Sequence, residues 1–386
     1  MSEPSARPIL QTRKVASRVD LTKEYLSAAR QPGQSGLRLC RRIVRCRFSG
    51  QKLTPEEFFH HGLHRPRVTD ADCATHLGVR AVTPFNTLLN GPAAQNDSAR
   101  LNNKLTTAEV LKAAGLPVAQ VRGVYQAMPG GTLRDAAEIA AFLLTPGQTP
   151  CFGKPVFGSL SNGIVSIEAV VGEEQILLGD GRKVSAAALA AEIVALYSEG
   201  YVFQELLRAA PSIAHLSGPV LPTLRVCSLW LKGAPVLLYG GLRLPAANAM
   251  SDESSKGGGA RLHIDMATGA VMHGQDMTKF SGSHTRHAPV TGLPLVGQSI
   301  PDWTAMLELA RDVHRVFHRH CCIGTDIAVS DHGLIVNEVN SNPLQLNYQV
   351  GCGRGILNDD FRPMFRAALA ERGITRPVRG APWPFV

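Results

Sequence analysis

The chain has 386 residues, of which 44% are apolar and 18% are charged, and its formal net charge is +9 at neutral pH. This length and apolar content exclude a disordered chain and predict two or three domains with a large hydrophobic core. No uninterrupted apolar run approaches the roughly 20 residues that a membrane-spanning helix needs. The first residues lack the hydrophobic segment of a secretory signal peptide, so the expected location is the cytoplasm.

The positive charge is concentrated at the start of the chain. Residues 1–70 contain 14 lysines and arginines against six acidic residues, whereas the rest of the chain is nearly neutral. The densest run, residues 37–48, is LRLCRRIVRCRF. It predicts either a helix with one buried apolar stripe and a solvated arginine face, or a surface that docks to an acidic partner or a membrane. Nucleic acid is the less favoured partner.

Residues 1–95 are predicted to form a mainly helical N-terminal region. Thr54, Pro55 and Glu57 have the order of a capping box with proline at the first helical position. The turn-rich sequence at 90–92 closes the region.

Lys104 stands directly before a segment with strong helical signals. Thr106 and Glu109 predict a capping box, and Gly115 predicts the end of the helix. A short strand is expected at 118–124.

Lys154 lies on a predicted strand that leads into a loop of small residues and a returning strand. The loop covers residues 158–163 and contains Gly158, Ser159 and Ser161. Such a loop can fold over phosphates and offer backbone N–H groups, while the lysine supplies a point charge. An ordinary hairpin turn has the same composition, and the loop matches neither a Walker A motif nor G-x-G-x-x-G.

The central part of the chain predicts two further strands and a flexible segment. Residues 201–207 read as a strand that leads into a hinge, and residues 223–226 open another strand. The Ser- and Gly-rich segment 251–259 predicts a flap over a bound ligand or a surface loop. Arg243 and Arg261 flank this segment, where they bind an anionic substrate or form ordinary surface ion pairs.

The stretch 324–343, GTDIAVSDHGLIVNEVNSNP, predicts a β-hairpin with a metal site. If its loop is residues 331–333, Asp326 and Glu338 lie opposite one another, and Asn340 shares their face. Two carboxylates so close repel each other unless a cation lies between them. Oxygen ligands of this kind suit Mg²⁺. The alternative is a hairpin whose acidic residues face solvent.

The order of these features is similar to that of the ATP-grasp superfamily, over residues 100 to 360. Within it, LPTLRVCSLW, GTDIAV and NEVNSNPLQLNYQ resemble the sugar-transfer-associated branch. The resemblance implies an α/β (α+β) fold in which two α+β subdomains clasp ATP. The ATP-grasp domain would cover residues 96–386, with a small lid-like subdomain at 118–203 and a larger subdomain that holds the metal at 204–386.

The resemblance also implies roles for individual residues. Those implied to contact ATP are Lys104, Lys154, Gly158, Ser159, Ser161, Gln204, Glu205 and Leu207, with backbone groups of Glu205 and Leu207 reading the base. Those implied in catalysis are Arg225, Lys154, Lys256 and Arg243. Those implied to bind Mg²⁺, for which Mn²⁺ is an alternative, are Asp326, Glu338 and Asn340. Arg225 would lie near the γ-phosphate or the substrate carboxylate, and a cross-sheet ion pair is its alternative. The segment after the hinge, residues 208–212, offers no acid for the ribose.

The activity that the resemblance implies is that of an ATP- and Mg²⁺-dependent carboxylate ligase. Such an enzyme joins a small carboxylate to an amine in an amide or related bond through an acyl phosphate. Two alternatives stay open: a phosphotransferase that acts on a hydroxyl, and a nucleotide-responsive binding protein without catalysis. A homodimer is common among similar folds. No residue is a convincing general base.

Overall fold

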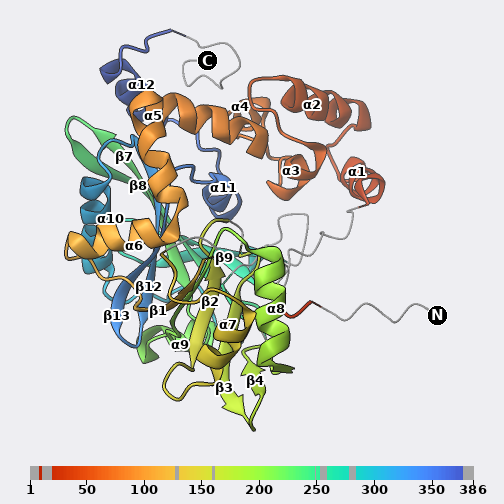
Figure 1. The fold of residues 1–386 in the computed structure, drawn as a ribbon. Helices are drawn as coiled ribbons and strands as arrows, with labels where there is room; N and C mark the ends of the chain where they lie inside the picture. The colour runs from red at the N-terminus through yellow and green to blue at the C-terminus, as the bar shows by residue number, and fades with distance from the viewer. Residues whose placement is uncertain are drawn as a thin grey trace.

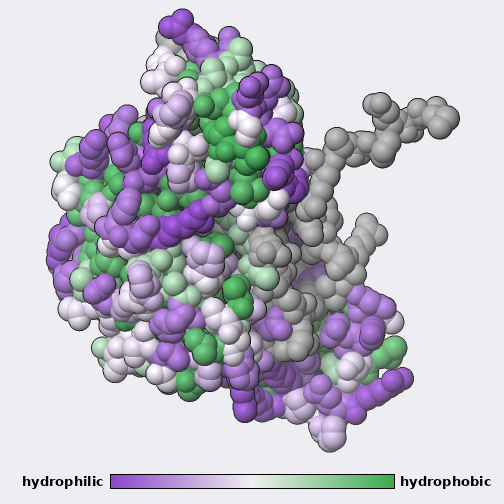
Figure 2. All heavy atoms as spheres, turned by 90° about the horizontal axis from the view of Figure 1, so that it is seen from below, coloured by the Kyte–Doolittle hydropathy of each residue, from purple (hydrophilic) through white to green (hydrophobic). Residues whose placement is uncertain are grey.

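The computed structural model describes residues 8–10, 20–126, 130–158, 161–247, 249–252, 259–277 and 284–376. Within these ranges, no helix combines the length and the apolar character that crossing a membrane requires. Hydrophobic and hydrophilic residues are interspersed over the face of the molecule that is seen from below (Figure 2).

The N-terminal region is helical, as predicted, and forms the upper right part of the molecule in Figure 1. Its helices are α1 (Leu21–Ala29), α2 (Gly36–Phe48), α3 (Pro55–His60), α4 (Asp70–Ala74) and α5 (Val79–Asn102). The capping box at the start of α3 is confirmed: the Thr54 side chain accepts from the backbone N–H of Glu57, and the Glu57 side chain accepts from that of Thr54. Helix α5 continues past residue 95 with a break at Gly91, and the domain boundary at 95 stays a prediction.

The helix that begins at Lys104 is capped by another residue than the one predicted. In α6 (Lys104–Ala113) the Asn103 side chain accepts hydrogen bonds from the N–H groups of Leu105 and Thr106. The predicted capping box of Thr106 and Glu109 is therefore wrong. Asparagine is as good an N-cap as threonine, and the earlier cap adds a turn that starts at Lys104.

A six-stranded sheet forms the smaller layer, with strand order β1-β6-β2-β3-β4-β5. Its strands are β1 (Val121–Tyr125), β2 (Cys151–Pro155), β3 (Val165–Val171), β4 (Gln175–Leu178), β5 (Lys183–Ser185) and β6 (Tyr201–Glu205). Helices α7 (Ala136–Leu144) and α8 (Ala186–Leu196) pack on this sheet (Figure 1). Their shared core includes Ile139, Ile193 and Phe203.

A seven-stranded antiparallel sheet forms the larger layer, with strand order β11-β10-β9-β8-β7-β12-β13. Its strands are β7 (Thr223–Leu231), β8 (Ala234–Leu244), β9 (Ala260–Ile264), β10 (Val271–Asp276), β11 (His284–Thr285), β12 (Cys322–Ser330) and β13 (Gly333–Asn340). The core that joins α9 (Pro211–Ser217) and α10 (Trp303–Val316) to this sheet includes Leu224, Leu262 and Val313. A second core joins the sheet to α5, α11 (Leu346–Cys352) and α12 (Arg362–Glu371).

The terminal hairpin pairs the predicted residues, but its turn is shorter than predicted and one strand contains a bulge. Asp326 does lie opposite Glu338. However, Ser330 pairs with Gly333, so the loop has two residues and not the three at 331–333. The register is restored by a bulge at Asn337 on β13, which adds one residue to that strand.

Candidate active site

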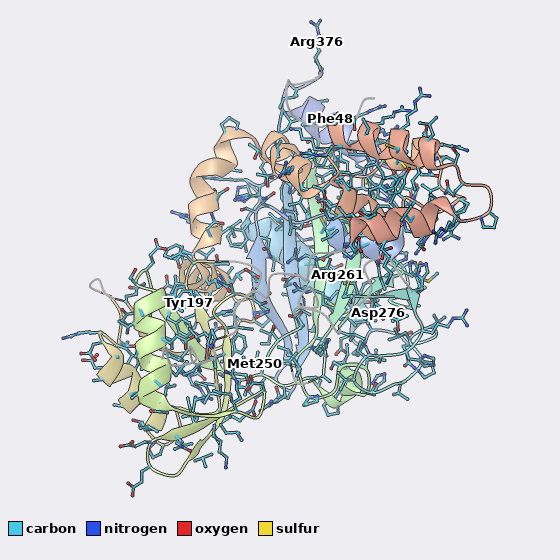
Figure 3. All side chains as sticks on the ribbon, turned by 90° about the vertical axis from the view of Figure 1, so that its right-hand side faces the viewer. Phe48, Tyr197, Met250, Arg261, Asp276 and Arg376 are labelled. Carbon is cyan, nitrogen blue, oxygen red and sulfur yellow. The ribbon has the colours of Figure 1, made fainter. Side chains whose placement is uncertain are left out.

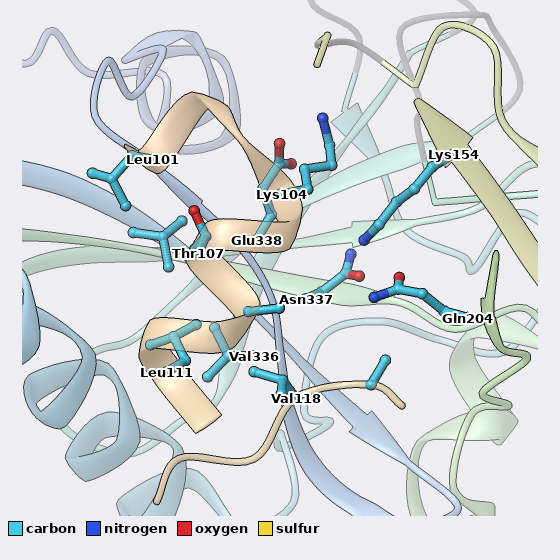
Figure 4. A pocket seen from close by; sticks show the side chains of 13 residues that line it. Leu101, Lys104, Thr107, Leu111, Val118, Lys154, Gln204, Val336, Asn337 and Glu338 are labelled. Carbon is cyan, nitrogen blue, oxygen red and sulfur yellow. The ribbon is translucent and has the colours of Figure 1, made fainter. Parts of the chain in front are cut away.

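The two predicted lysines meet Glu338 at the junction of the two sheets. Lys104 comes from the first turn of α6, Lys154 from β2, and Glu338 from β13, and all three line one cavity (Figure 4). The Lys104 Nζ donates a hydrogen bond of 2.7 Å to the carbonyl of Gly158, at the start of the small-residue loop. Glu338 follows Lys154 by 184 residues and Lys154 follows Lys104 by 50, yet the three elements converge on one place.

The charge balance of this cavity is unusual because both ammonium groups are largely removed from water. Burial, followed by the repulsion of Lys104, lowers the pKa of Lys154 to about 8, although Glu338 acts in the opposite direction. Burial also lowers the pKa of Lys104, again against the attraction of Glu338. One carboxylate thus faces two ammonium groups, and an incoming polyanion would stabilise both charges.

The small-residue loop forms a second part of the same cleft. A cavity of about 80 Å³ is lined by Lys104 and Lys154 together with Gly158, Ser161 and Glu338. Ser159 and Lys256, two further predicted site residues, lie outside the described residues.

The hinge after β6 borders a cavity of about 140 Å³ with an apolar wall. The wall is formed by Ala119, Phe152, Leu206, Leu207, Val220, Leu221 and Met250. Gln204, Glu205 and Leu207, the three residues that the family resemblance assigns to adenine binding, also line it. The backbone N–H of Glu205 is not available to a ligand, because it donates to the Gln120 carbonyl at 2.9 Å.

Acidic residues reach this cavity from places that the sequence did not indicate. Residues 208–212, which follow the hinge, offer none, but Glu168 of β3 and Asp252 both line the cavity. Glu168 is ion-paired with Arg208. Asp252 accepts from Thr223 and pairs with Arg243 at 3.1 Å. Their sequence context carries no motif, so only the fold identifies them as candidates for ribose contacts.

The predicted metal ligand Asp326 is fully buried between two arginines. Arg225 binds it through Nε and through Nη2 at 2.8 Å, and Arg243 binds it through Nη2 at 2.8 Å. Burial alone would raise the pKa of the Asp326 carboxyl, but the two guanidiniums hold that pKa below its ordinary value. The cross-sheet ion pair that was the alternative for Arg225 is therefore present.

These contacts leave limited room for a metal at Asp326. Each carboxylate oxygen accepts about two hydrogen bonds. Oδ2 already accepts two, from Arg225 and Arg243, whereas Oδ1 accepts one, from Arg225. A cation would therefore reach Asp326 through Oδ1.

Glu338 and Asn340 offer the remaining oxygens at the end of β13. Asn340 lies opposite Gly324, two residues from the Asp326–Glu338 pair. Its amide Nδ2 is buried and has no hydrogen-bond partner among the residues that the structure describes, whereas a cation would bind its Oδ1. Among the described residues, no group of three or more histidines, cysteines or acids stands ready to hold a metal. The set of two carboxylates and one amide nevertheless fits Mg²⁺, which takes its other ligands from water and phosphates.

The bulge at Asn337 adds a residue that the sequence did not predict. Along a regular strand, Asn337 and Glu338 would face opposite sides of the sheet. At a bulge this alternation is interrupted, and both side chains line the cleft, as Figure 4 shows. Asn337 also lines the cavity at the hinge, so it connects the parts of the cleft.

Arginines continue from the metal end across the sheet. Arg225 of β7 lies opposite Asp326 of β12. Arg243 of β8 pairs with Thr223 of β7 and, on its other side, with Arg261 of β9. Arg225 and Arg261 are both at least 94% buried. Like charges on directly paired residues are destabilising unless anions lie beside them, and Asp326 and Asp252 supply such anions to Arg225 and Arg243.

Two sheets that enclose a cleft, with Lys154 on the smaller sheet and with Lys104 and an acidic hairpin on the side of the larger one, define an ATP-grasp fold. The sequence profile described as sugar-transfer-associated ATP-grasp matches residues 86–361. The chain belongs to this family. No match was found among curated proteins.

Solved structures that resemble the chain are distant in sequence. The D-alanyl-alanine synthetase A from Vibrio cholerae is 15% identical, with a TM-score of 0.42, and the match covers 74% of this chain and 68% of that one. Biotin carboxylase from Campylobacter jejuni is 12% identical, with a TM-score of 0.43 and coverage of 73% and 48%. An L-amino acid ligase from Bacillus licheniformis is 12% identical, with a TM-score of 0.35 and coverage of 63% and 41%. The chain thus spans about half the length of most of the solved chains that it matches.

Proposed function

We propose that the protein is an ATP- and Mg²⁺-dependent carboxylate ligase that forms an amide or related bond through an acyl phosphate. The observation that carries this proposal is the meeting of Lys104, Lys154 and Glu338 in one cleft. A polyphosphate at this place would satisfy both buried ammonium groups. The adjoining cavity at the hinge has the apolar wall that a purine base needs, and it shares Gln204 and Asn337 with the lysine cavity.

The proposed chemistry solves the problem that a carboxylate resists attack by an amine. A carboxylate oxygen of the substrate attacks the γ-phosphorus of ATP, the bond between that phosphorus and the β,γ-bridging oxygen breaks, and ADP leaves. The amine nitrogen then attacks the acyl carbon, the new C–N bond forms, and inorganic phosphate leaves with the C–O electron pair. The amine loses one proton, for which this chain offers no assigned base.

The residues of the cleft would bring the anions together. Lys104 and Lys154 would bind the phosphates, and Arg225, Arg243 and the flap lysine Lys256 would stabilise the charge on the transferred group and the substrate carboxylate. Asp326 through Oδ1, Glu338 and Asn340 would hold Mg²⁺ (or Mn²⁺). The ion would add positive charge beside the phosphates. Closure of the two sheets over the cleft would exclude water from the acyl phosphate.

A hydroxylamine trap tests this function. The purified protein is incubated with ATP, Mg²⁺, hydroxylamine and a panel of small carboxylic acids, and both ADP and acyl hydroxamate are measured. We expect at least one acid to give both products in equal amounts. Glu338→Gln should abolish both, whereas Glu308→Gln on the exposed side of α10 should leave them unchanged.

Two results would reject the proposal. ADP that forms together with a stable phosphorylated alcohol, and without hydroxamate, would identify a phosphotransferase. Nucleotide binding without turnover on any acid would indicate a binding protein.

A further inference from the structure

Helix α2 has a second apolar stripe on its outer face. Its inner face carries Leu39 and Cys46, which are buried in the core of the N-terminal helices. On the outer face, Leu37 is 83% exposed, Val44 is 50% exposed and Phe48 is 82% exposed. The buried stripe and the solvated arginines that the sequence predicted are both present, and the exposed apolar residues of the outer face are an additional feature.

The three exposed residues form one line along the helix. At 100° per residue, the spacing of Leu37, Val44 and Phe48 places them within an arc of about 40°. Large apolar side chains are usually exposed singly, and a line of three on one helix face indicates a contact surface. We call Leu37, Val44 and Phe48 the outer stripe.

Arginines border the outer stripe on both sides. By the same helical geometry, Arg38, Arg41 and Arg45 lie on one side and Arg47 on the other. Arg38, Arg41 and Arg47 form no ion pair with any residue that the structure describes, and Arg45 reaches Asp70 only at 3.6 Å. The Arg47 guanidinium lies 5.9 Å from the centre of the Phe48 ring. The face is therefore apolar along its centre and cationic along its edges.

We propose that the outer stripe of α2 docks the protein on an anionic lipid surface. The helix has 13 residues and is about 20 Å long, which suits a helix that lies in the plane of the interface. Leu37, Val44 and Phe48 would enter the boundary between headgroups and acyl chains. The arginines would contact lipid phosphates, with their apolar stems alongside the stripe.

The charge of this face favours a lipid surface over a second copy of the chain. In a two-fold dimer the same patch occurs on both partners, so the four bordering arginines would face their own copies. An anionic membrane supplies the opposite charge on every side of the stripe. Phe48 lies at the outer edge of the molecule, and α2 packs on α1, α3 and α4, away from α6, β2 and β13, which line the cleft (Figures 1 and 3). Docking would therefore leave the cleft open.

Vesicle sedimentation of the full chain tests the proposal. Wild-type protein is mixed with vesicles of phosphatidylcholine alone or of phosphatidylcholine with phosphatidylglycerol. We expect binding to the anionic vesicles only, and weaker binding at high salt because surface charges are screened. The variant with Leu37→Ser, Val44→Ser and Phe48→Ser should bind at least tenfold more weakly. The variant with Arg38→Gln, Arg41→Gln and Arg47→Gln should bind about a hundredfold more weakly.

A matched control separates docking from general hydrophobicity. Leu196, Met272 and Val296 are 57%, 49% and 60% exposed and lie on other elements. Replacing these three with serine should leave vesicle binding unchanged. All three variants should keep the wild-type melting temperature and ADP release, since none of their positions lines the cleft.

Several results would overturn the proposal. One is that the wild-type protein does not sediment with anionic vesicles. Another is that the variant with Leu37→Ser, Val44→Ser and Phe48→Ser binds these vesicles as well as the wild-type protein does. A dimer that dissociates in the stripe variant, without any vesicle binding, would show that a second copy covers the face.

Discussion

Lys154 shares the cleft with Lys104, and burial lowers its pKa to about 8. In the free protein the ammonium group is therefore about half protonated at pH 8. A bound polyphosphate would raise this pKa again, so nucleotide binding at pH 8 should take up about half a proton. At pH 6 the lysine is already charged, and the uptake from this group should vanish.

Calorimetry of ADP binding in two buffers with different ionisation enthalpies measures this uptake. Lys154→Arg keeps the charge, but arginine does not titrate near pH 8. This variant should bind nucleotide without the proton uptake. Equal uptake by wild type and Lys154→Arg would show that another group titrates.

Asp326 is the only acid that both Arg225 and Arg243 contact among the described residues. Asp326→Asn should reduce the free energy of unfolding by about 3–5 kcal/mol, because the buried Arg225 would lose its counter-charge and Arg243 would keep only Asp252 among the described acids. Denaturant unfolding measures the change. Asp312→Asn breaks an exposed pair with Arg315 and should cost less than about 1 kcal/mol. Equal losses of unfolding free energy in Asp326→Asn and Asp312→Asn would contradict the idea that Asp326 joins Arg225 and Arg243 in a buried ionic cluster.

At this scale the sequence allows the chemical type of a site residue to be predicted, but not its partners. Lys104, Lys154 and Glu338 carry recognisable spacing, and the structure brings them together. Asp252 and Glu168 were missed because no local pattern distinguishes a cleft acid from a surface acid. Their position depends on how the two sheets approach one another, and only the fold determines that.

Among the elements, the hairpin of β12 and β13 depends on a glycine at its metal end. A Cβ at Gly324 would lie 2.9 Å from Pro343 Cβ and 3.0 Å from Arg225 Cδ. Gly324→Ala should therefore destabilise the fold by about 1–3 kcal/mol through overpacking. It should also weaken nucleotide binding, since Arg225 would move.

Gly241 on β8 provides the matched control. It pairs with Arg225, but a Cβ there would meet only the Leu262 carbonyl, at 3.5 Å. Gly241→Ala should leave the free energy of unfolding unchanged within about 0.5 kcal/mol or raise it slightly, because alanine restricts the unfolded chain. Thermal melts of Gly324→Ala and Gly241→Ala measure the two changes in stability. Equal melting temperatures would show that the hairpin accommodates the added methyl group.

The ends and irregularities of elements were harder to predict than their existence. The hairpin was visible from its β-branched runs, but a three-residue loop and a two-residue loop with a bulge give the same pairing of Asp326 with Glu338. The helix at Lys104 was visible too, yet both Asn103 and Thr106 are acceptable caps. Which of them caps the helix depends on the preceding chain, where Asn103 closes α5 as well as opening α6.

Across the whole molecule, the N-terminal region does more than carry charge, because α5 holds the metal end of the large sheet. The Asn90 Oδ1 accepts from the N–H of Cys322 at 2.8 Å, and its Nδ2 donates to the Ser341 carbonyl at 2.9 Å. One side chain therefore joins the start of β12 to the residue after Asn340. Asn86, one turn earlier, donates to the Pro343 carbonyl at 3.0 Å.

Asn90→Ala should therefore affect both stability and the site. The N–H of the fully buried Cys322 would lose its partner, and so would the Ser341 carbonyl, which together should cost about 2–4 kcal/mol of unfolding free energy. The freed end of β13 would hold Asn340 less firmly. In the presence of ADP, the Mn²⁺ concentration that gives half of the maximal thermal shift should rise several-fold.

Arg80→Ala, at an exposed position of the same helix, should change neither the free energy of unfolding nor the Mn²⁺ concentration that gives half of the maximal thermal shift. Asn90→Ala could lower the free energy of unfolding and leave the required Mn²⁺ concentration unchanged. That result would show that α5 supports the fold without positioning the metal ligand. If Asn90→Ala keeps both the wild-type unfolding free energy and the wild-type Mn²⁺ concentration, water replaces the asparagine between the two strands. A joint change, in contrast, would make the helical region a structural part of the ATP-grasp site, because the same amide that links α5 to β12 fixes the strand end that carries Asn340.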